Sequence, residues 1–148
     1  SDSISKSEAK DISGLILAGG FKEVGCNVDH QCILPDGSKE LLSTIKLWSS
    51  EGVELIITTG GTGLGPRDLT IETLEKHFNS NLPGIEQALH AYGRSKVKTS
   101  ILSRLKAGLI DKTIVICIPG SPSAAKDALN VLIPTIFHLF HMMKGEKH

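Results

Sequence analysis

Two apolar runs that end abruptly in glycine- and proline-rich loops constrain the fold of this 148-residue chain most strongly. Residues 53–59 (VELIITT) and 113–118 (TIVICI) are rich in β-branched residues, as is typical of strands covered on both faces. Residues 60–66 (GGTGLGP) follow the first run and residues 119–122 (PGSP) follow the second, and helical patterns come after both loops. This alternation predicts an α/β fold, a three-layer α/β/α sandwich with a mostly parallel sheet.

The remaining patterns complete one domain over residues 1–148, with no internal repeat or linker. We expect a helix at 11–24 with Asp11 as its N-cap, and a strand at 28–34 that ends in a Pro-Asp-Gly turn. Further helices are expected from Ser38 to Gly52, at 70–78, at 83–93, around 101–105, and from about 123 to 143, where Pro134 kinks or restarts the helix.

The composition excludes several classes of function. Lys and Arg number 16 and Asp and Glu number 16, so the formal charge is zero, which disfavours a sequence-independent nucleic-acid binder. Aromatic residues make up 4%, too few for a base-stacking platform. The apolar stretch 131–143 is too short to span a membrane, and residues 1–10 do not resemble a signal peptide. Three cysteines without a C-x-x-C pair suit reduced thiols in a cytoplasmic protein.

The loops that follow the strands carry the candidate site. Because parallel strands place their carboxyl ends at one edge of a sheet, the loops at Asp36, Gly60 and Pro119 should converge there, where ligands bind in such folds. Four glycines in residues 60–65 leave backbone N–H groups open to a phosphate, although a tight strand-to-helix connection would explain them too. Pro66 follows the last glycine, so this is neither a Walker A loop nor a dinucleotide-binding G-x-G-x-x-G loop.

Charged and hydroxyl side chains near these loops point to phosphate chemistry. Arg67 could contact a phosphate or pair with a carboxylate. Asp68 could hold Mg²⁺ beside phosphates or cap the next helix, and Asp36 could be a second carboxylate or part of an ordinary turn. Ser103 and Arg104 add a pair of hydrogen-bond donors from a distant segment.

Two further features extend this candidate site. The 119–122 loop could present amides and the Ser121 hydroxyl to a ligand at the start of the last helix, or form a turn with Ser123 as the helix cap. The lysines at positions 96, 98 and 106 form either a local basic rim or ordinary surface.

Residues 58–63 (TTGGTG) and 66–72 (PRDLTIE) together resemble the signature of the molybdopterin-binding adenylyltransferase family, which includes bacterial molybdenum-cofactor proteins, the plant G domain and the gephyrin G domain. The resemblance covers nearly the whole chain. It implies an α/β sandwich that assembles as trimers or hexamers, with molybdopterin and ATP meeting on the glycine loop. The implied reaction is a nucleotidyl transfer: the terminal phosphate of the pterin attacks the α-phosphorus of ATP, giving adenylyl-molybdopterin and pyrophosphate.

The resemblance also implies roles for individual residues. Asp36 and Asp68 match the two family carboxylates that are tied to Mg²⁺ and to catalysis. The residues expected to bind substrate are Ser3, Thr59, Gly60, Gly61, Thr62, Gly63, Arg67, Ser103, Arg104, Pro119, Gly120 and Ser121.

The sequence departs from the family pattern in three places. Ile71 replaces a usual proline, Gln87 replaces a common glutamate, and Ser1 stands where the family has just completed a central first strand. We therefore expect a domain without that strand, either because upstream residues are missing or because it belongs to a fusion with another cofactor-synthesis domain. The alternative function is a non-catalytic molybdopterin-binding or scaffold module, and the retention of both Asp36 and Asp68 favours the enzyme.

Overall fold

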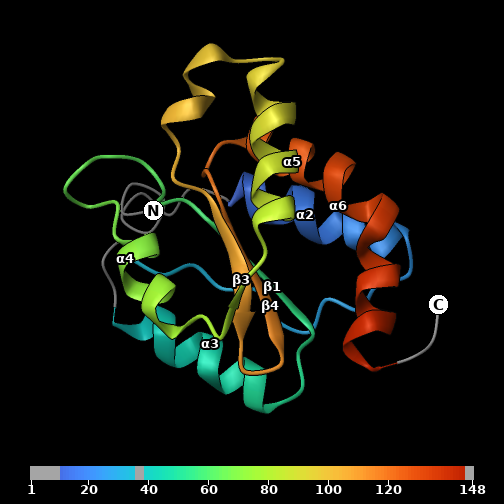
Figure 1. The fold of residues 1–148 in the computed structure, drawn as a ribbon. Helices are drawn as coiled ribbons and strands as arrows, with labels where there is room; N and C mark the ends of the chain where they lie inside the picture. Colours follow the sequence, from blue (N-terminus) through green and yellow to red (C-terminus); the bar gives the residue numbers. More distant parts are fainter. Residues whose placement is uncertain (1–10, 36–38, 146–148) are drawn as a thin grey trace.

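The computed structural model describes residues 11–35 and 39–145, which form an α/β sandwich (Figure 1). The sheet has the strand order β1-β4-β3-β2. Its strands are β1 (Leu55–Thr59), β2 (Ser80–Asn81), β3 (Lys106–Ile110) and β4 (Thr113–Ile118). Helices α2 (Ile12–Glu23), α5 (Pro83–Arg94) and α6 (Pro122–Met143) cover one face, and α3 (Glu40–Ser50) and α4 (Thr70–Leu74) cover the other. The predicted sandwich is confirmed.

Strand β4 lies between the two layers of helices, and all six of its residues are buried. Side chains of a strand point to alternate faces, so Ile114 and Ile116 pack against α2, α5 and α6, while Val115 and Cys117 pack against α3 and α4. This confirms the prediction of a strand covered on both faces. Strand β1 does not fit that description, because Ile56 is its one buried residue and β4 is its one neighbour within the described sheet.

The sheet is mixed, which corrects the prediction of a mostly parallel one. Strands β1 and β4 pair in parallel from Leu55 opposite Ile114 to Thr59 opposite Ile118. The β3–β4 and β2–β3 pairs are antiparallel. Strand β3 was not predicted, since its sequence KAGLI is short and contains a glycine. A tight turn at Asp111, where φ is 54°, joins it to β4 and so places it in the sheet.

The predicted helices are present with small changes at their ends. Asp11 caps α2 by accepting a hydrogen bond from the Gly14 amide at 2.9 Å. The expected 70–78 helix is divided into α4 and the 3-10 turn η1 (Glu75–His77), and the expected 101–105 turn lies earlier, as η2 (Lys98–Leu102). Helix α6 continues through Pro134 rather than restarting there. The predicted cap Ser38 lies outside the described residues.

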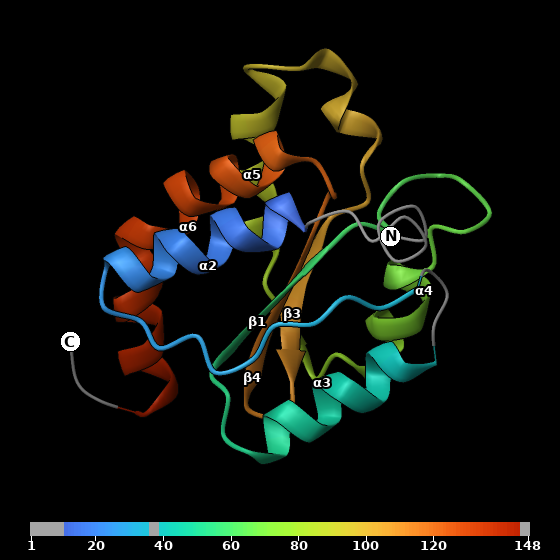
Figure 2. The same cartoon turned by 180° about the vertical axis from the view of Figure 1, so that it is seen from behind.

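The strand predicted at 28–34 is wrong, because residues 26–35 contain no strand. The segment runs beside β1 between α2 and α3 (Figure 2). A cavity of about 520 Å³ lies between the segment and β1. A β-rich sequence forms a ladder only where a neighbouring strand lies within hydrogen-bonding distance. None of the described helices is long and apolar enough to cross a membrane.

Candidate functional site

The loops after β1 and β4 meet at the carboxyl end of the sheet. The Gly60 amide donates to the Ile118 carbonyl at 2.9 Å, and a Cβ atom on Gly120 would lie 3.3 Å from the Gly60 Cα. Ser13, at the start of α2, donates its hydroxyl to the Gly120 carbonyl at 2.9 Å. The predicted convergence of these two loops is confirmed, while Asp36 in the third loop lies outside the described residues.

The first two glycines of the loop are required by its backbone conformation. Gly60 and Gly61 have φ angles of 96° and 71°, in the left-handed region that glycine adopts without a Cβ penalty. The Thr70 hydroxyl donates to the Gly60 carbonyl at 3.0 Å, and the Thr70 amide donates to the Gly61 carbonyl at 3.2 Å. These bonds hold the loop against the first residue of α4.

The next two glycines leave room for the Asp68 carboxylate. A Cβ atom on Gly65 would lie 2.8 Å from Asp68 Oδ2, and one on Gly63 would lie 3.0 Å from it. The Gly65 amide donates to the same oxygen at 2.9 Å. Asp68 therefore closes the glycine loop and does not cap the next helix, since the N-cap of α4 is Leu69 without a side-chain bond. The side chain of Arg67 is exposed.

Ser103 and Arg104 pack onto this loop from a distant part of the chain. The Arg104 amide donates to the carbonyl of the buried Thr62 at 2.8 Å, and the Ser103 hydroxyl donates to Thr62 Oγ1 at 3.1 Å. The Arg104 guanidinium donates to the Gly63 carbonyl from Nε at 3.0 Å and from Nη2 at 2.6 Å. Its Nη2 also donates to the Asp68 carbonyl at 2.9 Å. This arrangement places a fixed positive charge beside the loop.

Glu72 completes this contact network, and sequence reasoning missed it. Its carboxylate accepts a hydrogen bond from Arg104 Nη1, and this bond lowers the pKa of Glu72 below its ordinary value. The two residues lie 32 positions apart, a separation that no local pattern reveals. The signal in the sequence is the place of Glu72 as the last residue of the 66–72 segment, on the short helix that follows Asp68, although that segment assigns it no role.

The 119–122 loop begins helix α6 at the same edge of the sheet. Ser121 is the N-cap, since its hydroxyl accepts from the Ala124 amide at 3.1 Å, so the alternative cap Ser123 is wrong. Pro119 is half-buried and Gly120 is exposed. The positive end of a long helix thus lies beside the glycine loop, an arrangement that favours anions. Ser3, which the resemblance also indicated, lies outside the described residues.

The lysines considered as a basic rim are mostly engaged elsewhere. Lys96 Nζ lies 2.8 Å from Asp127 Oδ1, and Lys106 Nζ lies 3.4 Å from Glu75 Oε1. Lys98 is exposed. Ordinary surface therefore describes Lys96 and Lys106 better than a phosphate-binding rim. Within residues 11–35 and 39–145, no three His, Cys, Asp or Glu residues are grouped as metal ligands.

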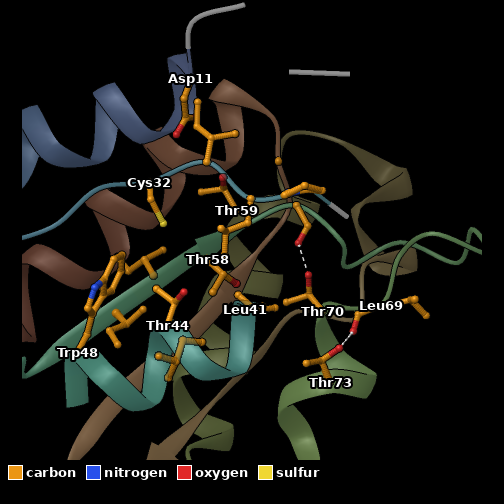
Figure 3. A pocket seen from close by; sticks show the side chains of 18 residues that line it. Asp11, Cys32, Leu41, Thr44, Trp48, Thr58, Thr59, Leu69, Thr70 and Thr73 are labelled. Carbon is orange, nitrogen blue, oxygen red and sulfur yellow. Dashed lines mark hydrogen bonds between the residues drawn. The ribbon is translucent and has the colours of Figure 1, made fainter. Parts of the chain in front are cut away.

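A small cavity of about 150 Å³ lies beneath the glycine loop. Threonines of α3, β1 and α4 surround it (Figure 3): Thr44, Thr58, Thr59, Thr70 and Thr73. Thr73 donates its hydroxyl to the Leu69 carbonyl at 2.7 Å, whereas Thr58 Oγ1 is buried without a partner among the described residues. Hydroxyl groups therefore line the cavity, and those of Thr70 and Thr73 already donate to backbone carbonyls.

A glycine loop, a helix N-terminus and a guanidinium meet at the carboxyl end of an α/β sheet, an arrangement that favours an anionic ligand. Residues 1–138 match the family model described as "Probable molybdopterin binding domain". The chain therefore belongs to the molybdopterin-binding domain family of molybdenum cofactor biosynthesis.

Similar proteins extend this assignment. The chain is 53% identical over all 148 residues to a molybdenum cofactor biosynthesis bifunctional protein of Chlorobaculum tepidum, of which it spans 47% of the length. It is 34% identical to molybdenum cofactor biosynthesis protein B of Staphylococcus carnosus, over 76% of this chain and 68% of that protein. A solved structure of MogA superimposes with a TM-score of 0.89 at 31% identity and covers 97% of this chain and 94% of its own.

Proposed function

We propose that this domain transfers the adenylyl group of Mg-ATP to molybdopterin during molybdenum cofactor biosynthesis. The observation that carries the proposal is the meeting of the glycine loop, the Ser103–Arg104 segment and the start of α6 at one edge of the sheet. The two substrates carry phosphates, and these three elements supply backbone amides, a guanidinium and a helix dipole to phosphate oxygens. Membership of the molybdopterin-binding family supports the choice of pterin substrate.

The donor set fits Mg²⁺, with Asp68 as one ligand. Oδ2 of Asp68 accepts one amide bond, and a carboxylate has about four lone-pair sites, so it retains capacity for a cation. Mg²⁺ in such sites is held by one or two carboxylates together with substrate phosphates. Asp36, the second carboxylate expected from the resemblance, would complete this set. When bound, Mg²⁺ would neutralise phosphate charge beside the loop.

The transfer needs positioning and charge stabilisation more than a nucleophilic side chain. An oxygen of the terminal phosphate of molybdopterin forms a bond to the α-phosphorus of ATP. The bond from that phosphorus to the bridging oxygen breaks, and pyrophosphate leaves with the electron pair. The glycine-loop amides would hold the phosphates in line, Arg104 would hold the loop and offer its remaining N–H group, and the buried scaffold around Thr62 would keep them there.

Incubation of the purified protein with ATP, Mg²⁺ and molybdopterin tests the reaction. We expect adenylyl-molybdopterin and pyrophosphate in equal amounts. Asp68→Asn should lower turnover by at least about a hundredfold, the scale found when one charge-stabilising group is lost, while pterin binding persists. Asp111→Asn is the matched control, since Asp111 is exposed and lies at the opposite end of β4. Pterin binding without turnover would instead identify a non-catalytic module.

The proposed assembly and partners follow from the same family. We propose that the domain works in the cytoplasm as a trimer or hexamer, and that it is joined to or associated with another cofactor-synthesis domain. The bifunctional relative, roughly twice as long as this chain, supports the second part. Mass measurement in solution tests the assembly, and a monomer at working concentration would contradict it.

A further inference from the structure

The Arg104 guanidinium is occupied almost entirely by the protein itself. It carries five N–H groups in a fixed planar arrangement. Nε donates to the Gly63 carbonyl, Nη2 donates to the carbonyls of Gly63 and Asp68, and Nη1 donates to Glu72. These contacts use four of the five groups. One N–H group remains for a ligand, so most of the guanidinium serves to hold the loop.

Glu72 determines the direction of this guanidinium. Because the group is rigid and planar, fixing Nη1 also fixes the directions of Nε and Nη2. Glu72 lies in the first turn of α4, whose first residue, Thr70, already binds the loop through Gly60 and Gly61. Helix α4 therefore contacts the glycine loop at two places. Thr70 binds the start of the loop directly, and Glu72 acts on its later part through Arg104.

We propose that Glu72 is a positioning residue for the glycine loop: it orients Arg104 so that the guanidinium holds the Gly63 and Asp68 carbonyls in the shape that binds ligand phosphate. The proposal rests on the function proposed above only where it concerns ligand affinity. The shape of the loop itself is a property of the ligand-free protein.

A different role for Glu72 leads to the opposite result. If the carboxylate merely competed with ligand phosphate for Arg104, its removal would free the guanidinium and strengthen binding of an anion. If Glu72 positions the loop, its removal weakens binding, because the Gly63 and Asp68 carbonyls lose their fixed donor. The sign of the change in affinity therefore separates the two roles.

Hydrogen exchange of the loop amides in the ligand-free protein tests the positioning directly. The reporters are the Asp68 amide, which donates to the Gly65 carbonyl, and the Thr70 amide, which donates to the Gly61 carbonyl. Glu72→Ala should speed their exchange by about two- to fivefold, the range for loss of an exposed ion pair. Glu72→Gln keeps an acceptor for Nη1 and should restore most of the protection. Arg104→Lys loses the planar set of donors and should speed exchange by about tenfold or more.

Calorimetric titration with Mg-ATP tests the consequence for binding. We expect Glu72→Ala to weaken Mg-ATP binding by about two- to fivefold and Glu72→Gln to lie close to the unaltered protein. The double variant of Glu72→Ala with Arg104→Lys should be little worse than Arg104→Lys alone, because both substitutions act through the same guanidinium.

Glu75→Gln supplies the matched control. Glu75 follows α4 directly, is 55% exposed against 48% for Glu72, and pairs with Lys106 instead of Arg104. It should leave loop exchange and Mg-ATP affinity unchanged. Tighter Mg-ATP binding by Glu72→Ala, or loop exchange in Glu72→Ala that equals the Glu75→Gln control, would overturn the proposal. Failure of every variant and of the unaltered protein to bind Mg-ATP would reject the proposed function, and the exchange measurement would still decide the role of Glu72.

Discussion

Replacing Gly60 and Gly61 by alanine, one at a time, tests the structure of the glycine loop. Both residues have left-handed φ angles, so each alanine introduces backbone strain of about 1–2 kcal/mol. Their surroundings differ. A Cβ atom on Gly60 would have no atom within 4 Å, whereas one on Gly61 would lie 2.0 Å from Thr70 Oγ1.

The Thr70 contact sets the difference between the two variants. The Gly61→Ala side chain must displace the Thr70 hydroxyl, which then loses its hydrogen bond to the Gly60 carbonyl. That loss adds about 0.5–1.5 kcal/mol to the strain. Gly61→Ala should therefore destabilise the domain by about 1.5–3.5 kcal/mol and Gly60→Ala by about 1–2 kcal/mol.

Urea unfolding measures this difference. With a slope of about 2 kcal/mol per molar urea, the midpoint of Gly61→Ala should lie about 0.3–0.8 M below that of Gly60→Ala. In a Thr70→Ala background the hydroxyl is absent and the nearest contact of the added Cβ is the Cβ of residue 70 at 3.0 Å, so the cost of Gly61→Ala should approach that of Gly60→Ala. A Gly60→Ala variant as unstable as Gly61→Ala, or additive effects with Thr70→Ala, would show that the Thr70 contact does not shape the loop.

Three further predictions concern a thiol, a carboxylate and a sheet edge. Burial raises the pKa of Cys117 to about 11, so in native protein near pH 8 a thiol reagent should modify the exposed Cys32 quickly and Cys117 only after unfolding; equal rates would contradict the buried β4 core. Because Arg104 lowers the folded-state pKa of Glu72, this pair should contribute stability above the ordinary value of 4.5 and lose it as the pH falls through the lowered value; Glu72→Gln should remove that part of the acid dependence of unfolding, and an unchanged profile would count against the pair. Because β1 is the edge strand of the sheet within the described residues, an extended apolar strand fused ahead of residue 1 should pair with it and raise the melting temperature, and a fusion that melts no higher would contradict this pairing.

The sequence predicts the elements whose burial follows from their own residues. Strand β4 is recognisable because all six of its positions suit burial on both faces. Helix α2 is recognisable from the Asp11 cap, even though its apolar residues are interrupted by glycines. By contrast, β3 depends on its hairpin with β4, and its short KAGLI sequence carries no strong strand pattern of its own.

The segment 26–35 shows the opposite case, a predicted strand that does not form. Its strand character and the Pro-Asp-Gly turn signal after it predict a strand, yet a cavity lies between it and β1 and it forms no ladder within the described residues, so it remains irregular. Strand formation requires a partner, and a pattern in one segment carries no information about whether that partner is present. This is also why β1, predicted as a strand covered on both faces, is half-buried.

The candidate site likewise contains features that the sequence predicts and features that it does not. The sequence could place Gly60 and Gly120 at one edge, because the position of a loop after a strand follows from topology. It could mark Arg104 as a donor but could not choose its partners, since three of its four hydrogen bonds go to backbone carbonyls, a group that every residue possesses. Counting the N–H groups of an arginine that are already used therefore decides how far it can serve a ligand. For Arg104 the count favours support of the loop, and this makes Glu72, which lies in the 66–72 signature without an assigned role, the residue on which that support depends.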